Sequence, residues 1–268
     1  MALQNRRLAA VLLIGLLAGI AAFWYWRAPS HPMDRQPLVL MSSIDLIWGE
    51  AEFGEIARGE GKSDPLFERL NRGRKIVAAD NVAQLQATKA KVAMLVQPRP
   101  FAPEDLVRID KWVRAGGRLL FFADPALQWP SNLPTGDPAR PLFTSMHSPL
   151  FTHWGVELVL PIDADASSAE VEINLGNRQI RSLSPGQWQS LPSGTGSCRL
   201  AQGGFVAECR PGKGQAILVA DADLLYSGLW QSALPGSDSS SNIDWTEQLL
   251  ARLETGRRIV GRRGDFLD

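Results

Sequence analysis

The sequence predicts an α/β fold in which a mostly parallel β-sheet is covered on both faces. Four short apolar runs lack the polar–apolar alternation of a half-exposed strand, which is typical of buried parallel strands. They are residues 37–41, 75–79, 91–96 and 118–123. A helix is expected over residues 103–115, between the third and fourth runs, so strand, helix and strand form a right-handed βαβ unit.

The expected helix carries signals at both ends. Pro103 suits the first helical position, and Glu104 and Asp105 place negative charge in the first turn. Gly116 and Gly117 follow the last turn, where glycine commonly ends a helix. Its apolar face consists of Leu106, Ile109 and Val113.

The pattern changes after residue 125. Residues 126–144 are rich in proline and polar groups and are expected to form a long surface loop. Short, partly alternating runs between about 156 and 211 predict an antiparallel β insertion. A buried strand then returns within 212–221, and a last helix is expected over 243–254. These elements define an α/β domain at 37–258, followed by a tail at 259–268.

The N-terminal segment predicts a single transmembrane helix. Residues 8–26 contain no charge and would span roughly 30 Å, the thickness of a bilayer core. Arg6 and Arg7 precede the segment, which predicts that the N-terminus stays in the cytoplasm and the rest lies in the periplasm of a bacterium. We therefore expect an inner-membrane anchor at 1–27 and a linker at 28–36.

A cleaved signal peptide is the alternative interpretation of this segment. Cleavage requires small residues next to the cleavage site. Cleavage after Ala22 would place Ile20 at the −3 position, and cleavage after Ala28 would place Trp26 there. Neither residue is small, so the sequence favours an uncleaved anchor.

The charge balance excludes some classes of partner. Lys and Arg together number 28, as do Asp and Glu, so the formal net charge is zero. A strongly basic surface is not indicated, and nucleic acid is not an expected partner. The chain has two cysteines and three histidines, too few for a zinc site of usual spacing, and no cofactor is indicated.

The two cysteines are expected to form a disulfide. Residues 198–209 look like a β-hairpin with Gly203 and Gly204 in a two-residue turn, which places Cys198 opposite Cys209. The expected Cα separation is about 5.5 Å, that of a hydrogen-bonded pair and within disulfide reach. A periplasmic location would let the bond persist. The alternative is a pair of small buried side chains that face each other.

Three segments carry a resemblance to a known family. They are the strand and following loop at 38–50, the helix end and strand at 112–124, and the glycine-containing strand at 212–223. Together they resemble uncharacterised ABC-transport-associated domains, whose relatives include gliding-motility auxiliary proteins. The resemblance covers most of residues 37–256 and implies a flavodoxin-like fold similar to that of class I glutamine amidotransferases.

The resemblance does not extend to amidotransferase chemistry. Those enzymes use a cysteine nucleophile on a sharp turn between a strand and a helix. In this sequence the corresponding strand ends at Ala123 and is followed by Asp124 and Pro125, with no cysteine. The resemblance therefore implies a domain without that activity.

Ligands of doubly wound sheets bind at the carboxyl ends of the strands. The candidate ligand-binding residues placed there are Ser42, Ser43, Trp48, Glu50, Gln97, Asp124, Asp221 and Asp223. Such a set could hold a sugar, a peptide or a cation. The alternative is structural: the aspartates cap turns or helices, the serines satisfy loop backbone groups, and Trp48 packs in the interior.

Two further kinds of site are not expected. Ser42 and Ser43 lie outside a G-x-S-x-G motif, and no spacing ties His147 or His153 to a serine and an acid, so no catalytic residue is assigned. Asp221 and Asp223 would share one face of a strand, but a single carboxylate pair offers too few oxygens for a hard cation. No metal site is assigned.

The expected function is a non-catalytic periplasmic binding or assembly domain that works beside the subunits of an ABC transporter at the inner membrane. The alternative is a divergent hydrolase of a cell-envelope substrate, with Asp124, Asp221 or Glu50 as acid or base. A convergent cleft of carboxylates with perturbed pKa values would favour the enzyme. Scattered capping roles would favour the binding domain.

Overall fold

The computed structural model describes residues 37–47, 63–161, 170–192, 198–232 and 238–261. The predicted anchor, the linker, Trp48 and Glu50 lie outside these residues. Within the described ranges, no helix is long and apolar enough to cross a membrane. The described residues all belong to one compact unit.

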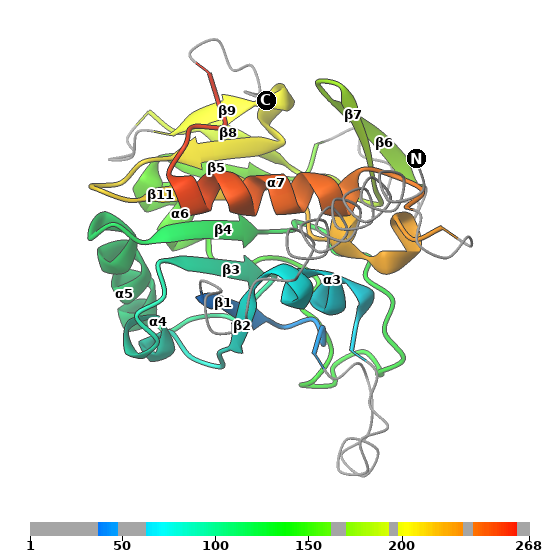
Figure 1. The fold of residues 1–268 in the computed structure, drawn as a ribbon, viewed down its shortest axis with the longest axis horizontal. Helices are drawn as coiled ribbons and strands as arrows, with labels where there is room; N and C mark the ends of the chain where they lie inside the picture. Colours follow the sequence, from blue (N-terminus) through cyan, green and yellow to red (C-terminus); the bar gives the residue numbers. More distant parts are fainter. Residues whose placement is uncertain (1–36, 48–62, 162–169, 193–197, 233–237, 262–268) are drawn as a thin grey trace, which may run out of the picture. The chain divides into compact units, whose positions relative to one another are not determined.

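A seven-stranded sheet forms the centre of this unit, with strand order β2-β1-β3-β4-β11-β10-β9 (Figure 1). The first five strands are parallel and the last two antiparallel, so the predicted α/β class and mostly parallel sheet are confirmed. In spatial order the strands are β2 (Lys75–Ala78), β1 (Pro37–Ser42), β3 (Val92–Val96), β4 (Arg118–Phe122), β11 (Gln215–Val219), β10 (Val206–Cys209) and β9 (Arg199–Ala201).

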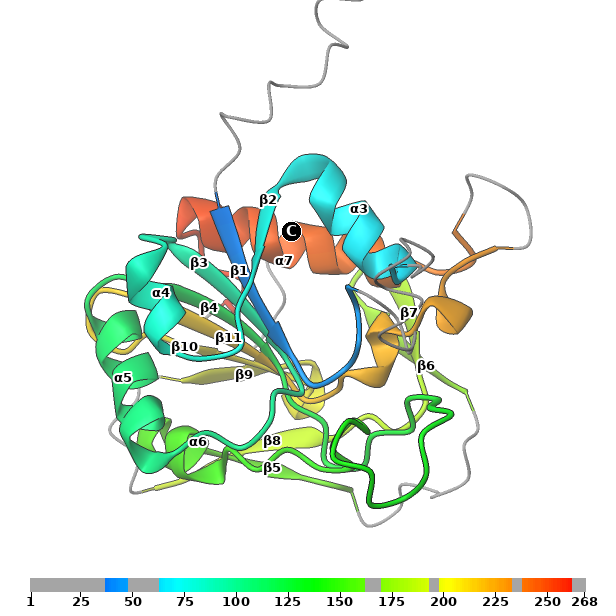
Figure 2. The same cartoon turned by 90° about the horizontal axis from the view of Figure 1, so that it is seen from below.

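Both faces of the sheet are covered, as continuous apolar runs require. All five residues of β3 and of β11 are buried. Alternate side chains enter two apolar clusters, one on each face, so Leu40 lies in one cluster and Val39 in the other. Helices α3 (Pro65–Gly73) and α7 (Asn242–Thr255) lie on one side of the sheet, as Figure 2 shows. Helices α4 (Ala83–Ala87), α5 (Pro103–Arg114) and α6 (Ser148–Trp154) lie on the other.

The turns that precede β4 and β11 pack against each other, which explains two glycines of the sequence motifs. The Lys213 backbone N–H donates to the Arg114 carbonyl at 3.0 Å. A Cβ atom on Gly214 would lie 2.0 Å from the Val113 carbonyl oxygen, and one on Gly117 would lie 2.4 Å from the Trp112 ring. A side chain at position 214 would therefore separate the two turns, and one at position 117 would displace the Trp112 ring.

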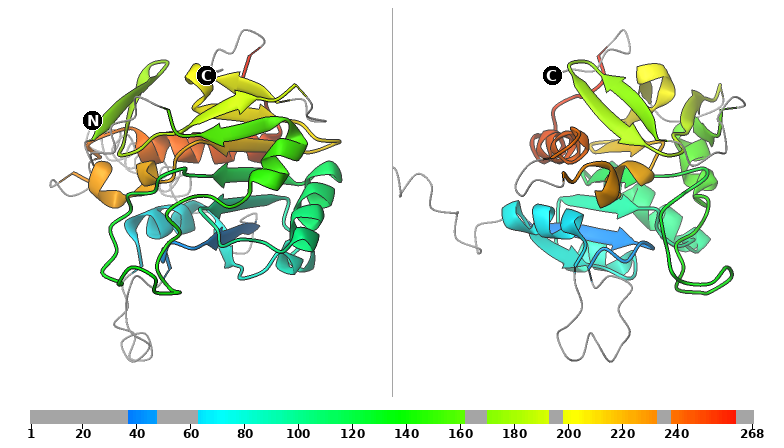
Figure 3. Two further views of the ribbon diagram at one scale, coloured as in Figure 1. Left: turned by 180° about the vertical axis from the view of Figure 1, so that it is seen from behind. Right: turned by 90° about the vertical axis from the view of Figure 1, so that its right-hand side faces the viewer.

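The β insertion is antiparallel, but its strands do not form one unit. Strands β9 and β10 extend the main sheet beyond β11. The other four form two separate two-stranded sheets, and Figure 3 shows one of them, β6–β7, standing apart from the main sheet. They are β5 (Val156–Val159) with β8 (Gln187–Ser190), and β6 (Val171–Leu175) with β7 (Arg178–Ser182). Three 3₁₀ turns complete the described elements: η2 (Gln202–Gly204), η3 (Asp223–Leu225) and η4 (Ser227–Leu229).

Strands β9 and β10 form a hairpin closed by a disulfide between Cys198 and Cys209. The loop between the strands has four residues, Gln202 to Phe205, instead of the expected two, because the last backbone pair is Ala201 with Val206. Phe205 N–H donates to the Gln202 carbonyl at 3.1 Å across Gly203 and Gly204, which form the central turn. Both glycines have positive φ, +62° and +94°, as a type I′ turn requires. The cysteine Cα atoms are 3.9 Å apart, closer than the expected hydrogen-bonded pair.

The end of the described chain packs on the core. Ile259 and Val260 are buried, and their backbone N–H groups donate to Glu208 Oε2 at 3.0 and 2.9 Å. Glu208 Oε1 accepts from Arg210 Nε at 2.7 Å, so its buried charge is compensated. The segment that follows α7 is therefore fastened to β10.

Candidate functional site

Three aspartates converge at the carboxyl ends of two neighbouring parallel strands. Phe122 of β4 pairs with Val219 of β11, so two residues later Asp124 lies beside Asp221. Asp223 follows in the same loop as the first residue of η3. One carboxylate oxygen from each of the three lies within 4.8 Å of the others, and all three side chains are buried. We call these residues the aspartate cluster.

Asp124 ties the two strand ends together. Its Oδ1 accepts from the Ala126 backbone N–H at 2.8 Å, and its Oδ2 accepts from the Ala222 backbone N–H at 2.9 Å. The first bond is a local turn of the kind that aspartate favours. The second joins the loop after β4 to the loop after β11, so this carboxyl group serves as a cross-strand cap.

The other two aspartates have unequal sets of partners. Asp223 accepts from the Gln128 backbone N–H at 3.0 Å and lies 2.7 Å from Ser184 Oγ. Asp221 Oδ1 accepts from the Leu224 backbone N–H at 3.2 Å. Asp221 Oδ2 is buried and makes no hydrogen bond of ordinary geometry among the described residues.

Burial raises the pKa of every member of the cluster. Desolvation, followed by the charge of Asp223, raises the pKa of Asp124 to about 7, although backbone N–H groups oppose the shift. The pKa of Asp221 lies well above its usual range, because of desolvation and then the charges of Asp124 and Asp223. Desolvation also raises the pKa of Asp223. These shifts follow because burial and like charges both disfavour the ionised form.

Gln97 and Ser43 fasten the end of β3 to this region. Gln97 Oε1 accepts from the Asp124 backbone N–H at 2.9 Å, and its Nε2 donates to the Asp124 and Leu142 carbonyls at 3.2 and 3.1 Å. The Ser43 hydroxyl donates to the Gln97 carbonyl. Gln97 has a φ of +40°, an unusual conformation for a residue other than glycine, and these bonds hold it there.

An open cavity lies at the carboxyl ends of β1, β2 and β3. It consists of two adjoining hollows of about 400 Å³ each, which share Ser42, Ala79, Asp80 and Arg99 as lining residues. Ser43 and Asp45 line one hollow, and Asp105 lines the other. We call it the switch-point cavity, because it lies where the strand order reverses between β1 and β3.

The predicted site residues therefore divide into three groups. Gln97 and the aspartate cluster are buried, whereas Ser42 and Ser43 line the switch-point cavity. Trp48 and Glu50 lie outside the described residues. Sequence reasoning missed Asp45, Asp80 and Arg99. All three follow a strand end by two or three residues, the same signal that identified Asp124 and Asp221.

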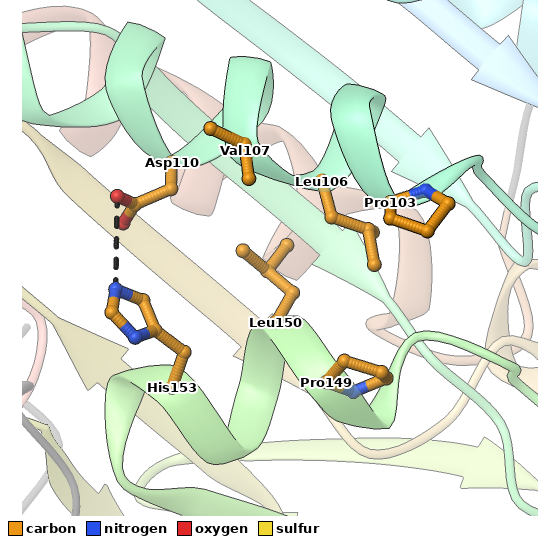
Figure 4. A pocket seen from close by; sticks show the side chains of 7 residues that line it. All are labelled: Pro103, Leu106, Val107, Asp110, Pro149, Leu150 and His153. Carbon is orange, nitrogen blue, oxygen red and sulfur yellow. Dashed lines mark ion pairs between the residues drawn. The ribbon is translucent and has the colours of Figure 1, made fainter.

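A third hollow lies between α5 and α6 (Figure 4). It measures about 370 Å³ and is mainly apolar. Its lining residues are Pro103, Leu106, Val107, Asp110, Pro149, Leu150 and His153. Asp110 accepts from Trp154 Nε1 at 2.8 Å and from Arg114 Nε at 2.8 Å, and His153 Nε2 lies 3.7 Å from it. Asp110 therefore links the two helices.

No thiol nucleophile is present. Both cysteines of the chain form the disulfide, and the position after Ala123 is Asp124. His147 is buried, with Nδ1 3.2 Å from Ser145 Oγ and Nε2 3.2 Å from the Arg99 carbonyl. Burial lowers the pKa of His147 to about 4, so it is neutral at pH 7. Its partners are structural.

Solved structures with a similar arrangement are distant. They include the N-terminal domain of mmIFT52 (13% identity, covering 82% of this chain and 98% of that chain, TM-score 0.48). An exo-β-1,4-mannosidase from Opitutaceae bacterium strain TAV5 has 13% identity, coverage of 82% and 36%, and a TM-score of 0.42. A β-galactosidase from Bacillus circulans sp. alkalophilus has 13% identity, coverage of 85% and 32%, and a TM-score of 0.43. This chain spans about a third of each glycosidase, and likenesses of this kind assign no function.

The sequence itself identifies a family. No curated protein matches the chain. Residues 65–198, half of the chain, match the family described as an ABC-type uncharacterized transport system, and the match extends from α3 through β8 to Cys198. It includes Arg99 of the switch-point cavity and Asp124 of the aspartate cluster. The protein is therefore a member of this ABC-type transport-system family.

Proposed function

We propose that this protein is a membrane-anchored, periplasmic and non-catalytic component of an ABC-type transport system, in which the described domain binds a ligand or a partner subunit. The family match over residues 65–198 carries the proposal. It assigns a transport-associated role, and the geometry of the sheet edge supports binding in preference to catalysis.

The proposed fold is flavodoxin-like and similar to that of class I glutamine amidotransferases. The five parallel strands have the order β2-β1-β3-β4-β11. Numbered along the chain this is 2-1-3-4-5, the order of flavodoxin-like doubly wound sheets. The residue after Ala123 is an aspartate with both oxygens bonded to backbone N–H groups, which supports a domain without the amidotransferase reaction.

The proposed location is the inner membrane, with the N-terminus in the cytoplasm. The charge-free segment 8–26 and the preceding Arg6 and Arg7 support a single anchor of that orientation. The Cys198–Cys209 disulfide is compatible with an oxidising compartment such as the periplasm. A C-terminal alkaline phosphatase fusion should be active, and an inactive but intact fusion would contradict the orientation.

The switch-point cavity is the proposed binding site. Hollows of about 400 Å³ lie within the size range of small-ligand sites. Asp45 and Asp80 supply acceptors and Arg99 supplies donors, and all three side chains are exposed. Groups of both signs on one edge suit a polar, uncharged or zwitterionic group, such as a sugar or a polar peptide segment of a partner subunit.

The hydrolase alternative has one observation in its favour. A pKa of about 7 would suit Asp124 as a general acid or base. However, Asp124 and Asp221 are buried, and their bonded oxygens accept from backbone N–H groups. A catalytic carboxyl group must reach the substrate, so these residues favour a structural role and we rank hydrolysis second.

Crosslinking in native membranes tests the proposal. The full-length chain, tagged at its C-terminus, should capture ABC transporter subunits, and Arg99→Ala should reduce that capture several-fold. Arg72→Ala on α3 is a matched control, because Arg72 is also exposed but does not line the cavity. Absence of transporter subunits above an anchor-only control would contradict the transport role. Equal capture by both variants would exclude the cavity as the binding site.

A further inference from the structure

The aspartate cluster places three carboxyl groups in the interior. Asp124, Asp221 and Asp223 are each 0% exposed. Among the described residues, none of the three forms a salt bridge with a lysine, arginine or histidine side chain. Buried charges in proteins are normally paired, protonated or bound to a metal ion. The cluster therefore requires a positive partner or protons.

A second observation lies next to the cluster, on a different element. Ser182, the last residue of β7, is 0% exposed, and its hydroxyl faces Asp221, whose ionised form it favours. Yet among the described residues neither Ser182 Oγ nor Asp221 Oδ2 makes a hydrogen bond of ordinary geometry. Two buried oxygen atoms without such a bond thus lie beside each other, whereas buried polar atoms are normally bonded.

Ser182 is held at this position by a buried asparagine. Asn242, the first residue of α7, accepts from the Arg181 backbone N–H at 2.8 Å and donates to the Arg181 carbonyl at 2.7 Å. The same amide group donates to the Leu224 carbonyl at 2.6 Å. Asn242 therefore fixes β7 against η3, and the Ser182 hydroxyl remains beside Asp221.

We propose that Asp124, Asp221 and Asp223, together with the Ser182 hydroxyl, bind one calcium ion. The donor atoms are all oxygens, which excludes the nitrogen and sulfur ligands that zinc and copper prefer. Calcium lies about 2.3–2.6 Å from its oxygens, so ligands on opposite sides are about 4.6–5.2 Å apart. The cluster oxygens lie within 4.8 Å of one another and fit around such an ion.

Burial selects calcium over magnesium. Magnesium loses its water shell reluctantly and usually keeps several waters, whereas calcium accepts a shell made largely of carboxylate, carbonyl and hydroxyl oxygens. Each of the three carboxyl groups offers one oxygen to the cluster, and Ser182 supplies a fourth. The site is separate from the switch-point cavity, so this inference does not depend on the proposed function.

Thermal unfolding of the full-length protein in detergent, stripped with EDTA and dialysed at pH 7.5, tests the proposal. At a calcium concentration about 100-fold above Kd, the midpoint should rise by about 5–10 °C. Magnesium at the same concentration should produce a much smaller rise. Equilibrium dialysis should find one calcium ion bound per chain.

Two variants and a control assign the binding to the cluster. Asp221→Asn keeps the side-chain shape, removes one charge and should abolish the calcium-dependent rise. Ser182→Ala retains all three carboxyl groups and should weaken calcium affinity several-fold, so the proposal remains testable if the first variant fails to fold. Glu157→Gln makes the same carboxylate-to-amide change at an exposed position and should behave as wild type.

Three results would overturn the proposal. The first is no bound calcium and no shift in the midpoint up to about 10 mM calcium, which would mean that protons neutralise the cluster. The second is an equal shift with magnesium, which would refute the calcium preference. The third is unchanged calcium affinity in both cluster variants, which would place the ion elsewhere on the chain.

Discussion

Opening the Cys198–Cys209 disulfide should lower the free energy of unfolding by about 3 kcal/mol. The two cysteines are 11 residues apart in the sequence, so the bond closes a short loop. The chain-entropy relation gives about 3 kcal/mol for a loop of this length, because the cross-link restricts the unfolded chain. Most of the effect is therefore expected in the unfolded state.

The folded hairpin should survive reduction. Three backbone pairs join β9 to β10, and the type I′ turn fixes their register. Cys209 is buried in an apolar cluster, where a thiol packs much as a disulfide sulfur does. A Cys198→Ala, Cys209→Ala double variant removes the sulfur atoms as well, so it should cost about 1 kcal/mol more than reduction alone.

Urea unfolding of unreduced, reduced and double-variant protein separates these contributions. The unreduced protein should have the highest free energy of unfolding, followed by the reduced protein and then the double variant. Thiol labelling of the unreduced, denatured protein comes first, because two free thiols in protein from the periplasm would rule out the bond. Equal free energies with and without reductant would refute the entropic reasoning.

Three further predictions concern the core and its polar contacts. Gly214→Ala should destabilise the fold by about 3 kcal/mol in urea unfolding, because its Cβ would overlap the Val113 carbonyl; Gly73→Ala, with open space around it, should be near neutral. Gln97→Ala should cost about 3 kcal/mol by leaving buried backbone groups unpaired. As the pH falls, His147 is protonated near pH 6.5 in the unfolded chain but only near pH 4 in the folded protein. The contribution of neutral, buried His147 to the free energy of unfolding is therefore present in full above about pH 6.5. That contribution should be lost as the pH falls to about 4, and His147→Phe should remove this part of the pH dependence.

Local patterns in the sequence predicted the main elements closely. The run at 118–123 became β4, Arg118–Phe122, and the helix expected over 103–115 became α5, Pro103–Arg114. Continuous apolar runs and terminal glycines depend only on residues close in the sequence, so they can be recognised without a structure. The same reasoning placed Asp124 and Asp221 at one edge of the sheet, since parallel strands share their carboxyl ends.

Long-range pairings were not predictable in this way. Strands β5 and β8 are separated by residues 160–186, yet they form one sheet, whereas β9 and β10 join the main sheet instead. The sequence also did not predict that the aspartates are buried, because their burial depends on segments that are distant in the sequence. Gly186, for example, donates its backbone N–H to the Ala220 carbonyl at 2.7 Å, which brings the segment after β7 over the end of β11.

Some polar residues that follow a strand end were not predicted as site residues. Asp80 follows β2 by two residues, as Asp124 follows β4 and Asp221 follows β11. Asp80 was not among the predicted site residues, although the run at 75–79 was correctly predicted as a strand. Arg99 was not among the predicted site residues either. Its place beside the cavity depends on the switch in strand order, which sequence spacing alone does not give.

The two halves of the carboxyl edge differ in a way that bears on function. At the ends of β4 and β11, the segments that contain Gln128, Ser184 and Gly186 bond to the aspartate cluster and to the Ala220 carbonyl. This half is closed, and it is where a nucleophile of the amidotransferase type would follow β4. At that position the chain has Asp124 instead of a cysteine, and the strand ends are covered. The half formed by β2, β1 and β3 keeps an open cavity with exposed charged groups. Recognition of a ligand or partner should accordingly take place at the switch point, while the closed half joins the insertion to the core.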